Sequence, residues 1–139
     1  PPRNLLVMVP AGYVVTKQEG PDFLVYRVRA LGRFGEARAT SALGIYLGGQ
    51  PNAFHDKLAA EGAKVLAETK GQLLQAETTW YRWSLPNDPP ELQRVEAAAD
   101  ASGLGQDIVA HVFFTAADER EAKELQQIAS SLAPAGREN

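Results

Sequence analysis

The chain has 139 residues, of which 45% are hydrophobic and 22% charged, and its formal net charge is −3. This length suits one domain spanning residues 1–139, and the composition is that of a globular rather than a disordered protein. Cysteine is absent, which excludes thiol catalysis, thiolate metal sites and disulfides, and the negative net charge argues against nucleic-acid binding.

Alternation of polar and apolar residues predicts that most of the chain forms strands. We expect strands at residues 5–9, 13–17, 23–30, 43–47, 64–68, 78–85 and 108–115. In residues 78–85, Trp80 and Trp83 fall on opposite faces, which predicts a strand covered on both sides. Residues 92–101 fit a strand or a helix, because alanines dominate a stretch that also alternates. Lys70-Gly71 is a candidate turn.

Two helices are predicted. Residues 53–61 follow Asn52, a suitable N-cap, and stop at Gly62, which tolerates a left-handed conformation. Residues 116–132 carry an apolar stripe at helical spacing, and Thr115 with Asp118 resembles a capping box. The order of these elements predicts an α+β fold, with an antiparallel β-sheet that has a helix on each side.

Charge is distributed unevenly. Residues 1–70 hold nine basic and six acidic residues, whereas residues 71–139 hold five basic and eleven acidic residues. This asymmetry indicates either a polarised binding surface or a solvated acidic face on the last helix. The apolar run at residues 5–9 is far shorter than the ~20 residues that span a bilayer, so no membrane span is expected. The chain starts at Pro1-Pro2 without a methionine, from which we expect a removed signal peptide and a periplasmic location.

Catalytic patterns are weak. His111 alternates with Val109 and Phe113 in a strand, which favours a buried core residue over a general base, and His55 beside Asp56 is expected at the surface. No Gly-x-Ser-x-Gly elbow occurs, and the glycine pair Gly103 and Gly105 leads into a strand rather than a helix. We therefore expect no enzyme activity, no cofactor and no metal site.

Loops carry the candidate partner-binding residues, because function concentrates where a scaffold presents loops. Phe34 lies between glycines with charges beside it, so it is either an exposed anchor for a protein partner or a residue that folds back onto the core. A second group surrounds the proline cluster that ends residues 78–85. The candidates are Arg33, Phe34, Glu36, Asn87, Asp88, Glu91 and Asp107.

Several segments resemble the Mog1/PsbP-like family. They are Val9-Pro10-Ala11-Gly12-Tyr13, the hairpins that follow, the short helix near Phe54, Thr79-Trp80-Tyr81-Arg82-Trp83, and the strand at 108–115 followed by a helix beginning Ala116-Ala117-Asp118. The resemblance covers most of the chain and implies an αβα sandwich without catalytic machinery. Members of the family are Ran-binding nuclear factors, photosystem subunits and small bacterial envelope proteins, including immunity proteins that block type VI secreted effectors. The resemblance assigns no role to an individual residue.

The sequence therefore predicts a periplasmic immunity protein that binds and blocks a cell-wall-degrading type VI secreted effector, such as a peptidoglycan hydrolase. The alternative is an envelope domain that binds a small ligand or a lipid on the sheet bearing Trp80 and Trp83. A third possibility is a weak hydrolase that uses His111.

Overall fold

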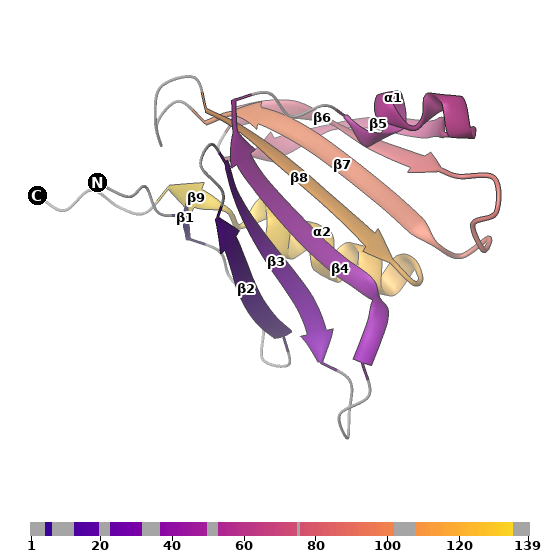
Figure 1. Cartoon of the computed structure of the whole chain (residues 1–139), viewed down its shortest axis with the longest axis horizontal. Helices are drawn as coiled ribbons and strands as arrows, with labels where there is room; N and C mark the ends of the chain where they lie inside the picture. Colours follow the sequence, from indigo (N-terminus) through magenta and orange to yellow (C-terminus); the bar gives the residue numbers. More distant parts are fainter. Residues whose placement is uncertain are drawn as a thin grey trace, which may run out of the picture.

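The computed structural model describes residues 5–6, 13–19, 23–31, 37–49, 53–74, 76–101 and 108–134. Seven strands form one sheet (Figure 1). The strands of this sheet are β2 (Tyr13–Glu19), β3 (Phe23–Leu31), β4 (Ala37–Gly48), β5 (Lys64–Leu73), β6 (Ala76–Ser84), β7 (Gln93–Asp100) and β8 (Val109–Ala116). The remaining elements are β1 (Leu5–Leu6), α1 (Phe54–Lys57), the 3-10 turn η2 (Ala59–Glu61), α2 (Glu119–Ser130) and β9 (Ala133–Pro134). The short helix α1 and the turn η2 lie between β4 and β5, and the longer helix α2 follows β8, the last strand of the sheet.

The seven strands lie in the order β2-β3-β4-β8-β7-β6-β5, and every neighbouring pair is antiparallel. The group β2-β3-β4 therefore meets the group β8-β7-β6-β5 where β4 pairs with β8, in the middle of the sheet. This arrangement leaves β2 and β5 as the two edge strands. A separate antiparallel pair joins β1 to β9.

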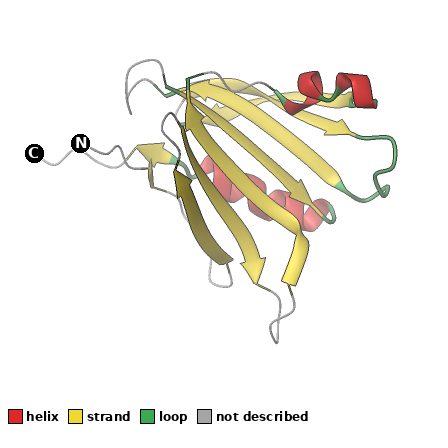
Figure 2. Cartoon of the chain, in the orientation of Figure 1, coloured by secondary structure: helices red, strands yellow, loops and turns green. Residues whose placement is uncertain are grey.

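The main core lies between α2 and one face of the sheet, which we call the α2 face. Leu125 and Ile128 of α2 are each 1% exposed and belong to one buried cluster with Leu43, Val112 and Phe114 of the central strands. Burying apolar area of this kind stabilises a fold by roughly 25 cal/mol per Å². The helix spans the sheet behind β4 and β8 (Figures 1 and 2) and leaves β5 and β6 less covered.

In the described part of the chain, the opposite face, which we call the α1 face, is covered by the four-residue helix α1 and the turn η2 (Figure 2). The prediction of a sheet flanked by helices on both sides is therefore wrong: the fold is an α+β open antiparallel sheet with one main C-terminal helix. The chain at residues 53–61 breaks after Lys57, because Leu58 leaves the helical conformation and the next residues tighten into a 3-10 turn. Gly62 then ends the turn at φ +94°, as predicted.

The structure resolves one ambiguous element prediction and contradicts two others. The ambiguous residues 92–101 form strand β7, so cross-strand packing outweighs the helical propensity of the alanines. The candidate turn at Lys70-Gly71 is wrong, because β5 continues through both residues to Leu73. The capping-box prediction is also wrong: Asp118 is itself the N-cap of α2, and its side chain accepts a hydrogen bond from the backbone N–H of Glu121.

Candidate functional sites

The candidate loop residues divide into two groups. Arg33, Phe34, Glu36 and Asp107 lie outside the described residues. Asn87, Asp88 and Glu91 all lie in the turn that joins β6 to β7, which brings these three together as expected.

Within this turn, Asp88 holds the backbone in place. Its carboxylate accepts a hydrogen bond of 2.8 Å from the backbone N–H of Leu85 and two from the Arg94 guanidinium, at 2.8 and 2.9 Å. The hydrogen bonds from Arg94 lower the pKa of Asp88, outweighing the effect of burial. Arg94 also lies over the ring of Trp83, 5.4 Å from its centroid. Asp88 is thus held by internal contacts, whereas Asn87 and Glu91 remain exposed to solvent.

A second polar centre, which was not predicted from the sequence, lies beneath α1. Glu96 of β7 is 1% exposed and contacts both histidines of the chain, so we call Glu96, His55 and His111 the Glu96 cluster. His111 Nε2 lies 2.7 Å from Glu96 Oε1, and His55 Nδ1 lies 2.5 Å from Glu96 Oε2. The expectation that His111 is buried is confirmed at 4% exposure. The expectation that His55 is a surface residue is wrong, since its side chain is 12% exposed.

Glu96 also caps α1. The N-cap residue Ala53 offers no side-chain acceptor, and the backbone N–H groups of Phe54 and His55 donate instead to Glu96, at 2.7 and 2.8 Å. Burial raises the pKa of Glu96, but the hydrogen bonds from His111, from the two backbone N–H groups and from His55 together lower it to about 2. Both carboxylate oxygens are thereby engaged within the protein, which suits an anchor for α1 better than a catalytic base.

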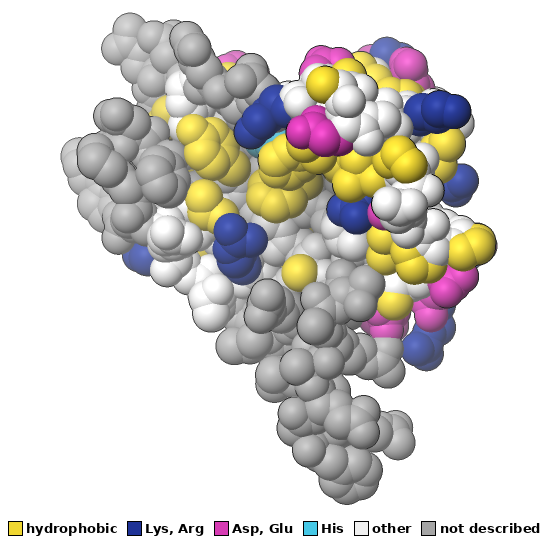
Figure 3. Space-filling view, turned by 45° about the vertical axis from the view of Figure 1, so that its right-hand side comes forward, with side chains coloured by type: hydrophobic (Ala, Val, Ile, Leu, Met, Phe, Trp, Pro, Cys, Tyr) yellow, Lys and Arg dark blue, Asp and Glu magenta, His cyan; other side chains and the backbone are white. Residues whose placement is uncertain are grey.

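Aromatic rings enclose this cluster on the α1 face. The Phe54 ring lies 5.0 Å from that of His111 and 4.8 Å from that of Phe113, while His55 lies 4.5 Å from Tyr81. Hydrophobic side chains gather on this side of the molecule, with basic side chains beside them (Figure 3). The indole Nε1 of Trp83 is buried and has no hydrogen-bond partner within the described structure.

Strand β5 lies at an edge of the sheet and is exposed over most of its length. It pairs with β6 on one side, and each residue from Lys64 to Lys70 is exposed to solvent. Its register with β6 shifts between Val65 and Ala67, which is the mark of a β-bulge. Val65 is 40% exposed and Leu66 52%, and these two are the large exposed hydrophobic residues of the described structure. We call Lys64–Lys70 the β5 edge.

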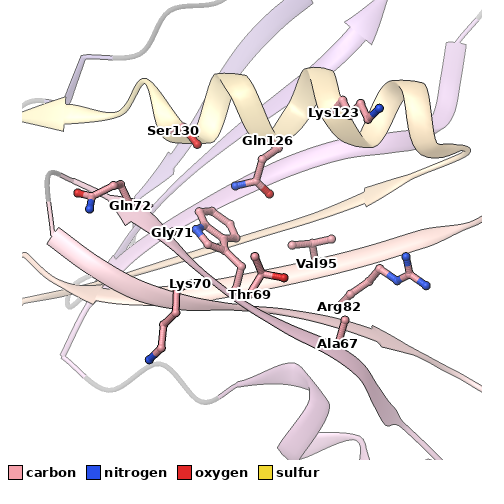
Figure 4. A pocket seen from close by; sticks show the side chains of 11 residues that line it. Ala67, Thr69, Lys70, Gly71, Gln72, Arg82, Val95, Lys123, Gln126 and Ser130 are labelled. Carbon is pink, nitrogen blue, oxygen red and sulfur yellow. The ribbon is translucent and has the colours of Figure 1, made fainter.

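On the α2 face, a groove of about 560 Å³ separates α2 from the outer strands β5 and β6 (Figure 4). We call it the α2 groove. Trp80 lines it, whereas Trp83 belongs to the α1 face and contacts Phe54. The two tryptophans are both buried, as predicted, but they do not form one ligand platform. The lining residues are Ala67, Thr69, Lys70, Gly71, Gln72, Trp80, Arg82, Val95, Lys123, Gln126 and Ser130.

The described residues contain no group of three or more His, Asp or Glu side chains arranged to hold a metal ion. No helix among them has the length and apolar character needed to cross a bilayer.

Comparison with protein families, with curated proteins and with solved structures finds no match for this chain.

Proposed function

We propose that this chain works by binding another protein, as a periplasmic immunity protein that blocks a peptidoglycan hydrolase delivered by a type VI secretion system. The observation that carries the proposal is the β5 edge, an edge strand exposed along seven residues with two large apolar side chains near its start. We also propose that the fold is Mog1/PsbP-like, on the basis of the sequence resemblance.

An exposed edge strand is a template for a partner's strand, since one row of its backbone N–H and C=O groups is unpaired. The pairing would extend the seven-stranded sheet by one strand, and main-chain hydrogen bonds would supply much of the affinity. Val65 and Leu66 would supply the apolar contact, because both lose exposed area when a partner covers the edge. An inhibitory interface of ordinary size buries about 1,600 Å² in total, so surfaces beside β5 take part as well.

The chemistry of the Glu96 cluster supports binding over catalysis. Its carboxylate and the facing nitrogen atoms of both histidines are engaged with one another. The partner therefore supplies the catalytic site, and this chain supplies the surface that blocks it.

The experiment mixes the purified chain with each peptidoglycan hydrolase that the same genome encodes as a type VI effector, and measures binding and cell-wall hydrolysis. We expect nanomolar to micromolar binding to one hydrolase and loss of its activity. Leu66→Lys replaces the more exposed of the two apolar side chains of the β5 edge with a charge and is expected to weaken binding at least about tenfold, or 1.4 kcal/mol. Gln18→Lys is the matched control, because it adds the same charge to an exposed position of the opposite edge strand β2.

Two results would overturn the proposal. One is the absence of binding and inhibition across all effectors of the host. The other is inhibition that Leu66→Lys and Gln18→Lys leave equally unchanged, which would move the interface away from the β5 edge.

A further inference from the structure

We propose that the α2 groove binds a small organic anion with an apolar body, of the alkyl- or aryl-carboxylate class. This inference goes beyond the proposed function, since the groove opens on the α2 face and needs no protein partner. Its volume of about 560 Å³ falls within the range of small-molecule sites, roughly 300–1,000 Å³.

The groove exists because α2 packs mainly on the central strands. The helix contacts β8 and β4 more than β5, so the outer part of the sheet diverges from it. Ala67, Thr69 and Gly71 alternate along β5 on the side that faces the groove, and all three are small. Small side chains on one wall leave space that larger ones would fill.

The floor of the groove is apolar. Trp80 is 6% exposed, and its ring lies so close to Gly71 that a methyl group there would come within 2.7 Å of the indole Cδ1. Val95 of β7, 8% exposed, lines the floor beside it. An apolar body placed here would contact an aromatic ring and an aliphatic side chain that are already fixed by the core.

The charge of the groove is positive. Among the described residues, its lining includes cationic side chains and no carboxylate. Arg82 from β6 and Lys123 from α2 lie on opposite walls at the same end of the groove (Figure 4). Lys123 lies 3.8 Å from Glu119, but both side chains are about three-quarters exposed, so this pair constrains the amine weakly. An anionic head group at this end of the groove would be attracted by both cations.

A third cation, Lys70, also lines the groove. Its side chain runs away from α2 (Figure 4), and its Nζ donates to Thr79 Oγ1 at 3.3 Å on the other face of the sheet. Lys70 is therefore a lining residue whose amine is directed away from α2, so this amine would not face a ligand held between α2 and Trp80. The far end of the groove carries uncharged polar side chains, including Gln72 and Ser130.

The test titrates the chain with octanoate and, separately, with 3-phenylpropionate, using calorimetry for affinity and nuclear magnetic resonance for location. The two ligands distinguish an alkyl from an aryl body. We expect saturable binding of at least one of them with a stoichiometry of one, and weaker binding of octanol, which lacks the charge. The chain has two indole N–H signals. That of Trp80 is expected to shift on binding while that of Trp83 stays in place, and Trp83→Phe assigns them.

Three variants test the charge. Arg82→Gln and Lys123→Gln are each expected to lower the affinity about two- to fivefold, because partly exposed ion pairs contribute modestly. The control Arg120→Gln, at an exposed position of α2 that does not line the groove, is expected to leave the affinity unchanged. All three positions are exposed, so an unchanged far-ultraviolet circular dichroism spectrum confirms that each variant is folded. The proposal is overturned if neither ligand binds at millimolar concentration, if binding shifts the Trp83 signal instead, or if the three variants behave alike.

Discussion

Glu96 accepts a hydrogen bond from His111 Nε2 at 2.7 Å, from one strand to the next within the sheet. The two residues are diagonal neighbours, since Glu96 pairs with Phe113 and His111 pairs with Ala98. The bond fixes one carboxylate oxygen on the sheet while the backbone of α1 donates to the same carboxylate. A single side chain of β7 therefore joins the sheet to the short helix above it.

Replacing the Glu96 carboxylate tests whether it links the sheet to α1. Glu96→Gln keeps the shape but turns one acceptor oxygen into an N–H₂ group, which then faces donors. We expect the free energy of unfolding to fall by about 2–4 kcal/mol, since buried donors lose a charged acceptor. Urea denaturation at pH 7 measures the change. Glu91→Gln removes the same charge from an exposed position and is expected to stay within about 0.5 kcal/mol of the parent. Equal stabilities of the two variants would contradict the anchoring role.

The lowered pKa of Glu96 predicts that the folded chain loses stability in acid. The pKa of Glu96 is lowered from 4.5 to about 2 in the folded chain, so its contribution is complete above pH 4.5. As the pH falls from 4.5 towards 2, the unfolded chain takes up the proton first, and stability falls by an amount on the order of 3 kcal/mol. Urea midpoints between pH 2 and 7 measure this. The stability gap between the parent and Glu96→Gln should narrow across that window, and a constant gap would show that Glu96 titrates normally.

Phe113 and Gly44 form a close pair on the α1 face. The two residues are cross-strand partners, and the Phe113 ring occupies the space that a side chain at position 44 would need. Gly44→Ala is expected to destabilise the chain by about 1–3 kcal/mol, because the ring is also packed on Phe54 and cannot move freely. Adding Phe113→Leu should recover part of the loss, giving a coupling energy of about 1 kcal/mol in a double-mutant cycle.

Gly49 supplies the control for that cycle. A methyl group at Gly49 would meet no atom within 4 Å, so Gly49→Ala should change the unfolding free energy by less than about 0.5 kcal/mol. A similar cost at both glycines would mean that the backbone, rather than the Phe113 ring, sets the effect.

The pair of Asp88 and Arg94 is expected to stabilise the turn between β6 and β7. Asp88→Asn weakens two hydrogen bonds from Arg94 and is expected to cost about 1–2 kcal/mol in thermal or urea unfolding. Asn87→Ala, at the exposed neighbouring position, should be neutral. If Asp88→Asn is as stable as the parent, the pair with Arg94 contributes no net stability.

The strands were predictable from the sequence because alternation is a local property, and β6 and β8 appear where the pattern placed them. The length of α1 was not predictable in this way, because it depends on contacts with the sheet. Asn52 and Gly62, which set the predicted bounds of the helix, carry no information about those contacts. The position of His55 also escaped prediction. Its partner Glu96 lies 41 residues away, and only the strand order brings them together. A carboxylate in the alanine-rich strand β7 was the one local sign of a polar contact there.

The capping of α1 by a distant strand has a consequence for the order of folding. A helix of four residues does not persist alone in water, because its nucleation cost exceeds what so few hydrogen bonds return. Its first turn is completed by Glu96, and that side chain takes its place only once β7 has paired with β8. The amide hydrogens of Phe54 and His55 therefore become protected from exchange only after the last strands of the sheet are in register. Their exchange rates report on the integrity of a sheet to which neither residue belongs.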